Sequence, residues 1–191
     1  MKPLPNGAAR TGRREQPERH REGGGRSSTI IPEDTTYQER KSMQYSEGQV
    51  GRVFTVRIDD GEDFIREIRR FVTAMNISSG MIHFLGATRS AKIVTGPKEL
   101  TVPPSPRGEE IFGGWELLGF ATIYPGEEGP SIHIHTAAGK GIRSLAGCLR
   151  EKAEVYIVVE AIITEFVGVS AKRTLDEKTG VDLPVFDRIL P

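Results

Sequence analysis

The sequence predicts an α+β domain built on a largely antiparallel sheet with one main amphipathic helix. Only one segment, 61–75, places its apolar residues at helical spacing. Most of the remaining chain consists of short alternating or β-branched runs, which Gly- and Pro-containing turns separate in hairpin-like order. With 191 residues, 37% of them hydrophobic, the chain is long enough for one such domain and some excess length.

Residues 1–46 are expected to form a disordered basic and polar tail ahead of the folded domain at 47–191. The tail is rich in Gly, Pro, Arg, Glu and Ser, so it cannot bury enough apolar surface to offset the entropy of ordering. Residues 1–26 hold seven Arg or Lys against three Glu. This charge fits either a solvated leader or a weak nucleic-acid arm, although the Arg-Gly-Arg-Pro core of an AT-hook is missing.

Charge and composition exclude several classes of protein. Residues 47–191 hold 17 basic and 20 acidic residues, so any attraction to DNA should come from the tail or from a local patch. The single cysteine, Cys148, forbids an internal disulfide and suits a reducing compartment. No run approaches the roughly 20 apolar residues of a membrane helix, and Arg13-Arg14 has no apolar segment after it. We therefore expect a soluble, cytoplasmic protein without a membrane partner.

The first strand and the helix have the clearest local signals. Residues 52–58 alternate polar and apolar side chains and run into Asp59-Asp60-Gly61, which predicts a strand followed by a turn. The helix is predicted over 61–75, with Asp60 or Gly61 as its N-cap. Its apolar face consists of Phe64, Ile65, Ile68, Phe71, Val72 and Met75.

The rest of the domain is predicted to be mostly strands. They are expected at 79–86, 90–95, 115–124, 131–137, 153–165 and 167–172, with a short apolar segment at 145–149. The first two are expected to be joined at 87–89, and the chain after 172 is turn-rich. Residues 96–113, which carry four prolines, are expected to be a long connection, and such loops are usually functional or disordered.

A candidate metal site comes from His133, His135 and Cys148. In a strand Ile132 and Ile134 can enter a core while the two histidines project together on the other side. Two imidazoles and one cysteine from a neighbouring strand would form an open three-ligand site for zinc or iron. Alternatively, the histidines are ordinary polar residues facing solvent and Cys148 is a small buried hydrophobe.

Two glutamates are candidates to support this site. Glu160 lies in the apolar run 155–163, where an unpaired carboxylate would be costly, and Glu116 follows Trp115. Either could accept a hydrogen bond from a ligand histidine, or face water or an arginine instead. His83 could be an extra ligand, but it fits an ordinary strand histidine better.

In order and spacing, several segments resemble the PPC domain, the "plants and prokaryotes conserved" domain known from plant AT-hook nuclear proteins. The resemblance spans about 50–186. It rests on 54–62, 80–90, Gly114-Trp115-Glu116-Leu117-Leu118, His133-Ile134-His135, Gly147-Cys148-Leu149 and 155–163.

The resemblance implies a highly twisted, mainly antiparallel sheet and assembly as a homotrimer. Some prokaryotic relatives are similar to metalloproteins in which a His-x-His pair and a third histidine hold a zinc-like ion near the subunit interface. His133 and His135 match that pair, whereas Cys148 stands where the third histidine usually is, which favours a softer ion and a redox-sensitive site.

Three functions remain open at this point. The first is a homotrimer with one divalent metal, zinc or iron, per subunit and a regulatory, DNA-associated role. The second is a hydrolase-like metal enzyme for a small molecule, with a pocket beside the metal lined by 96–113. The third is an assembly module whose histidines hold no metal.

Overall fold

The computed structural model describes residues 43–190, so nearly all of the tail predicted for 1–46 lies outside the described residues. The described chain begins with β1 (Gln44–Tyr45), which pairs with β9 (Arg188–Ile189) near the other end. The described strands therefore include β1, which lies within the segment assigned to the tail. Within 43–190 no helix is long and apolar enough to cross a membrane.

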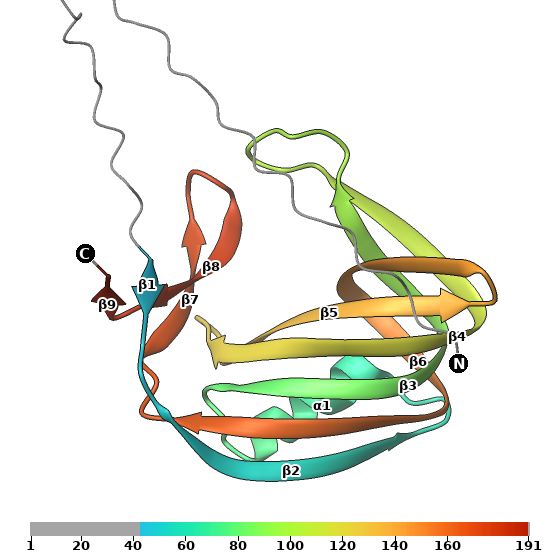
Figure 1. Cartoon of the computed structure of the whole chain (residues 1–191), viewed down its shortest axis with the longest axis horizontal. Coiled ribbons are helices and arrows are strands. Elements are labelled where there is room, and N and C mark those ends of the chain that lie inside the picture. The colour runs from blue at the N-terminus through green and yellow to red at the C-terminus, as the bar shows by residue number, and fades with distance from the viewer. Residues whose placement is uncertain (1–42, 191) are drawn as a thin grey trace, which may run out of the picture. The chain divides into compact units, whose positions relative to one another are not determined.

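A five-stranded antiparallel sheet dominates the fold, as predicted (Figure 1). Its strands, in spatial order, are β2 (Gln49–Asp59), β6 (Arg143–Val167), β3 (Gly80–Pro97), β4 (Pro106–Pro125) and β5 (Pro130–Lys140). The first half of β6 also pairs with β5, so β3, β4, β5 and β6 close into a ring of paired strands. This closure places β5 directly beside Cys148.

Two pairs of segments expected to be separate are single long strands. The segments 79–86 and 90–95 both belong to β3, and 145–149 and 153–165 both belong to β6. At the polar interruptions the register shifts between Thr88 and Ser90, and Glu151 adopts a φ of 63°. A β-bulge bends a strand without reversing it, which is why these interruptions do not end the strands.

The predicted connection over 96–113 is wrong in its extent. Strand β3 runs to Pro97 and β4 begins at Pro106, so only 98–105 connect them. Pro97 and Pro106 pair with each other at the strand ends, where proline's missing N–H interrupts no interior hydrogen bond. The prolines therefore mark the limits of a long hairpin.

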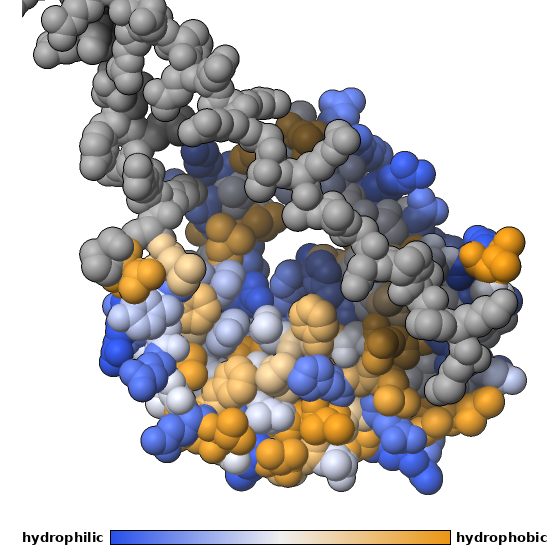
Figure 2. Space-filling view, viewed as in Figure 1, coloured by the Kyte–Doolittle hydropathy of each residue, from blue (hydrophilic) through white to orange (hydrophobic). Residues whose placement is uncertain are grey.

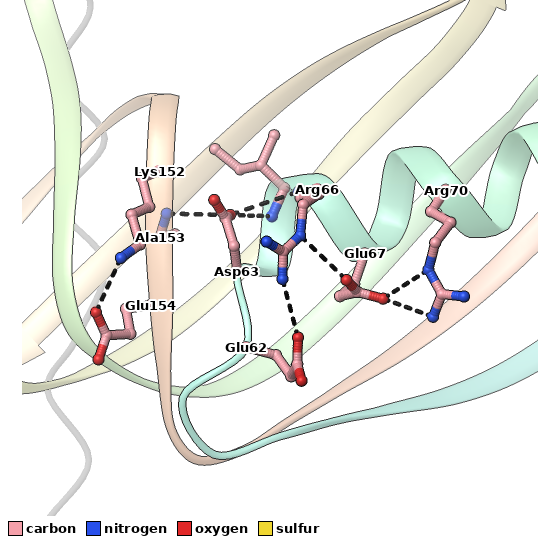
Figure 3. A network of polar contacts seen from close by, with 9 residues as sticks. Glu62, Asp63, Arg66, Glu67, Arg70, Lys152, Ala153 and Glu154 are labelled. Atoms are coloured by element: carbon pink, nitrogen blue, oxygen red, sulfur yellow. Dashed lines mark hydrogen bonds and ion pairs between the residues drawn. The ribbon is translucent and has the colours of Figure 1, made fainter.

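The helix α1 (Phe64–Ala74) forms where the apolar spacing predicted it. It begins after Asp63, whose carboxylate accepts hydrogen bonds from the backbone N–H groups of Ile65 and Arg66 (Figure 3). Asp63, rather than Asp60 or Gly61, is thus the N-cap. The helix buries Phe64, Ile68 and Val72.

Side chains of the sheet separate into a core face and an outer face. Ile82, Ala121, Ile134 and Ile163 belong to the buried core that also contains the apolar side of α1. Their neighbours along the strands point the other way, and several of these are large and apolar. They include Leu85, Leu118, Phe120 and Ile162, which are 49–65% exposed. Figure 2 shows apolar side chains gathered on the sheet face that Figure 1 turns toward the viewer, with α1 behind it.

A second hairpin follows the sheet. The strand predicted at 167–172 is displaced to β7 (Ala171–Asp176), and the segment predicted to be turn-rich contains its partner, β8 (Val181–Phe186). The hairpin contacts β4 through an edge-to-face pair of the Phe186 and Tyr124 rings and a hydrogen bond from Arg173 to Thr122. Arg173 is buried by these contacts.

Candidate metal centre

The strand β5 presents the two histidines as its alternation predicted. Ile134 and Thr136 are buried, while His133 and His135 lie on the opposite face with more exposure. In the register of the sheet His135 is opposite Cys148 on β6, so that the cysteine shares the face of the histidines. The structure thus brings together the three residues that the sequence singled out.

Their potential ligand atoms converge on one point. The Nε2 atoms of His133 and His135 are 3.2 Å apart, and Cys148 Sγ is 3.3 Å from the first and 2.9 Å from the second. All three potential ligand atoms lie within 4.8 Å of one another. Around a tetrahedral zinc ion, bond lengths of about 2.0 Å to nitrogen and 2.3 Å to sulfur give N–N separations of about 3.3 Å. The nitrogen pair matches this spacing, and the sulfur is close enough to complete the set.

The surroundings of His133 favour its neutral form. Burial, together with the positive charges of Arg173 and Arg150 and neighbouring His135, lowers the pKa of His133 to about 4. A neutral imidazole offers a lone pair to a metal without first losing a proton. His133 is therefore in its metal-binding form at neutral pH.

Close backbone approach beside Cys148 requires a glycine. A Cβ on Gly147 would lie 2.1 Å from the carbonyl oxygen of Val94 on the adjacent strand. Gly119 on β4 allows the same close approach to β5, since a Cβ there would lie 2.3 Å from the carbonyl oxygen of His135. These two glycines let β3, β4, β5 and β6 come together around the three ligand candidates.

The two glutamates and His83 lie elsewhere on the sheet. Glu160 is exposed, with Arg57 and Leu85 as its cross-strand neighbours, and Glu116 is opposite Gly139, four positions along β5 from His135. At about 3.3 Å per residue that offset is roughly 13 Å. Within one chain, the structure does not bring either carboxylate to the histidines. His83 is also outside the group and lines a groove beside His135.

A cavity of about 540 Å³ borders His133. It is lined by Ser131 and Ile132 of β5, by Arg150 and by residues of the β7–β8 hairpin, including Arg173 and Asp182. Residues 96–113 do not line it, contrary to expectation. Arg150 and Arg173 were not predicted, and the one available signal was that Arg173 lies two residues from each of the apolar residues Ala171 and Leu175, which share its face in a strand.

The antiparallel fold with three convergent N and S atoms on one sheet face defines a small domain with a candidate metal centre. Residues 45–167 match the family model of the Plants and Prokaryotes Conserved (PCC) domain. The chain belongs to this family, which confirms the resemblance to the PPC domain. No curated protein matches the chain.

Several solved structures share the fold. The metal-containing protein AF0104 from Archaeoglobus fulgidus is 30% identical and superposes with a TM-score of 0.66 over 74% of this chain and 98% of its own. A PPC protein from Pyrococcus horikoshii is 21% identical, with a TM-score of 0.65 over 78% of this chain and all of its own. A candidate DNA-binding protein from Bacteroides thetaiotaomicron is 20% identical, with a TM-score of 0.62 over 76% and 100%.

Proposed function

We propose that this protein is a homotrimeric metal-binding protein that holds one divalent ion per subunit at His133, His135 and Cys148. The observation that carries the proposal is the convergence of two Nε2 atoms and one Sγ within 4.8 Å. The 30% identical relative from Archaeoglobus fulgidus is itself named as metal-containing, which supports the assignment.

Zinc fits this donor set best, and iron is the alternative. Imidazole nitrogen and thiolate sulfur are the usual zinc ligands in proteins. Three protein ligands leave a fourth position, at which a bound zinc ion would polarise a ligand or lower the pKa of a water molecule. The chain itself keeps His133 neutral and places Cys148 opposite His135.

The outer face of the sheet supports assembly of several subunits, and their number, three, follows from the resemblance to the PPC domain. A row of paired residues crosses this face from Ile162 through His83 and Phe120 to His135. The large apolar residues Leu85, Leu118, Phe120 and Ile162 are exposed on this face. A patch of exposed apolar residues is uncommon on a monomer and typically marks an interface. Because His135 belongs to the same row, assembly over this face would bring a second subunit to the metal centre.

A DNA-associated regulatory role is proposed for the tail and not for the domain. The domain region 47–191 has more acidic than basic residues, whereas 1–26 are basic. Binding that depends on phosphate neutralisation weakens steeply with salt. Removing residues 1–42, which leaves β1 intact, should therefore abolish salt-sensitive retention on a DNA column. Unchanged retention would exclude the tail as its cause.

The cavity beside His133 favours a second candidate, a metal-dependent enzyme acting on a small molecule. Its volume of about 540 Å³ is within the range of small-molecule sites. A hydrolase would use the open metal position to activate water. His133→Ala should then eliminate turnover of any substrate that the wild-type protein hydrolyses.

The metal is tested by elemental analysis of the purified, tag-free protein. We expect near-stoichiometric zinc in the wild type, lost in His133→Ala and in Cys148→Ala. His83→Ala is the matched control, because His83 lies on the same sheet face but outside the ligand group, and it should retain the metal. Wild-type protein without metal after zinc supplementation would contradict the proposal and leave an assembly module.

A further inference from the structure

The guanidinium of Arg173 is buried without an acidic hydrogen-bond partner. The residue is 7% exposed, and its Nε has no hydrogen-bond partner. Nη1 donates to the backbone carbonyl of Asp182 over 3.3 Å, and Nη2 donates to Thr122 Oγ1 over 2.9 Å. A guanidinium has five N–H donors, and only two of them reach these neutral acceptors. Arg173 therefore retains unused donors.

The Arg173 cation lies over the Tyr124 ring, with Cζ 5.8 Å from the ring centroid, but an aromatic ring supplies no full counter-charge. Burying an ion is costly unless it is paired and hydrogen-bonded. Within residues 43–190 no carboxylate lies within salt-bridge distance of Arg173, although the charge of Asp182 acts on it from further away. Arg150 adds a second positive charge beside it, likewise without an ion pair in that range.

These two arginines meet His133 at one cavity. The cavity of about 540 Å³ is lined by His133, Arg150 and Arg173, and Asp182 is its one acidic lining residue. An adjoining cavity of about 560 Å³ shares both arginines but adds Arg69, Glu127 and Glu128, so its charges balance. The lining of the cavity beside His133 therefore carries a net positive charge, whereas the lining of the adjoining cavity does not.

We propose that the cavity beside His133 binds a small molecule through an oxyanion group, a carboxylate or a phosphate, held by Arg150 and Arg173. Planar guanidinium groups are suited to both groups because two N–H bonds can reach two oxygens at once. A further contact, from the oxyanion to an ion held by His133, rests on the proposed function. The arginine contacts do not depend on that ion.

The test is calorimetric titration of the full-length protein with inorganic phosphate and, separately, with oxalate. Both the zinc-loaded and the metal-free protein are titrated, and zinc content is measured for every sample. We expect at least one anion to bind, with Arg150→Gln weakening the affinity on the order of tenfold, the loss of one charge-assisted hydrogen bond. Arg57→Gln, an exposed arginine on β2, is the control and should bind like the wild type.

Arg173→Met provides a second, independent variant. An unpaired buried ion is costly, and an apolar side chain of similar length removes that cost, so this variant should fold and still fail to bind the anion. Phosphate bound more tightly than oxalate assigns the ligand to phosphate compounds, and the reverse order assigns it to carboxylates.

The outcomes separate this inference from the metal proposal. Anion binding to metal-free protein that is weakened in Arg150→Gln supports the arginine site even if no sample contains zinc. Stoichiometric zinc without binding of either anion overturns the inference and leaves the metal proposal intact. Binding that neither arginine variant alters also overturns it.

Discussion

Cys148 is the residue by which this chain would depart from the pattern that the PPC resemblance implies, a His-x-His pair with a third histidine. A thiolate is a softer ligand than an imidazole and carries a negative charge. It is also open to oxidation, and Cys148 is only partly buried, with its Sγ 2.9 Å from His135 Nε2. Oxidation of Cys148 should consequently release the metal ion from the proposed centre.

Cys148→His should retain zinc and lose sensitivity to peroxide. Oxidation of the thiolate removes one of three protein ligands, and a histidine at this position would not be oxidised in this way. Zinc release is followed with a colorimetric chelator while peroxide is added. The wild type should release its zinc and Cys148→His should not. Equal release from both proteins would show that Cys148 is not the oxidised ligand.

The candidate site was predictable where strand alternation determines side-chain direction. Ile132 and Ile134 had to face a core, which fixed the side of His133 and His135. Arg173 could not be predicted, because it reaches the site only through the β7–β8 hairpin, whereas the sequence predicted a strand that ended at 172 and turns after it. Glu160 was expected near the histidines because it interrupts an apolar run, but on the exposed face that interruption needs no partner.

The start of the helix depends on Asp63. Its carboxylate accepts from two backbone N–H groups of the first turn, and it also lies 3.5 Å from the backbone nitrogen of Ala153 on β6. Figure 3 shows these contacts beside a row of exposed ion pairs that links Glu62, Arg66, Glu67 and Arg70. The cap should therefore matter more to stability than the ion pairs.

Asp63→Ala should lower the free energy of unfolding by about 1 kcal/mol. Glu62→Ala, which removes an exposed i,i+4 pair with Arg66, should lower it by less than about 0.5 kcal/mol. Urea denaturation of both variants measures the difference. Similar losses in the two variants would mean that the cap contributes no more than a surface ion pair.

An arginine on β2 connects the last part of β6 to the end of the helix. Glu165 accepts hydrogen bonds from the backbone nitrogen, Nε and Nη2 of Arg52, and Nη2 also donates to the carbonyl of Met75. The hydrogen bonds from Arg52 lower the pKa of Glu165 from its ordinary value of 4.5. A lowered folded-state pKa adds stability that is fully present above the ordinary pKa and is lost as the pH falls through the folded one.

The stability difference between wild type and Glu165→Gln should therefore shrink as the pH is lowered from neutral to well below 4.5. Denaturant titrations over a series of pH values measure it. Arg57→Gln is a suitable control, because its pair with Asp59 is highly exposed and should contribute little at any pH. A difference that stays constant down to strongly acidic pH would show that the Glu165 carboxylate is not the stabilising group.

Sequence patterns identified best the elements that have one buried face and one solvent-exposed face. The helix and β5 have such faces, and both were found. Two of the three longest strands, β3 and β6, were split in the prediction, since polar residues at bulges resemble those at turns until their partners are known. The ring closure of β5 onto β6 depends on contacts between distant segments, which local patterns do not contain.

Assembly is the property of the whole molecule on which the metal centre could depend. The exposed groove beside His135 is lined by Leu118 and Phe120 and has a volume of about 470 Å³. Charges placed in the middle of a buried interface are strongly disfavoured, whereas the same change in an isolated monomer would leave these exposed positions almost unaffected. The effect of such a change thus separates an interface from a free surface.

Phe120→Glu should convert the proposed trimer into a monomer, as measured by light scattering coupled to size-exclusion chromatography. Leu100→Glu is the control, because Leu100 is 99% exposed in the loop 98–105 and should leave the trimer intact. A wild-type mass of one chain would contradict the trimer directly. If Phe120→Glu is monomeric and still holds zinc, the three ligands of one chain suffice. If it is monomeric and zinc-free, metal binding requires the neighbouring subunit. Assembly and metal binding are then thermodynamically coupled.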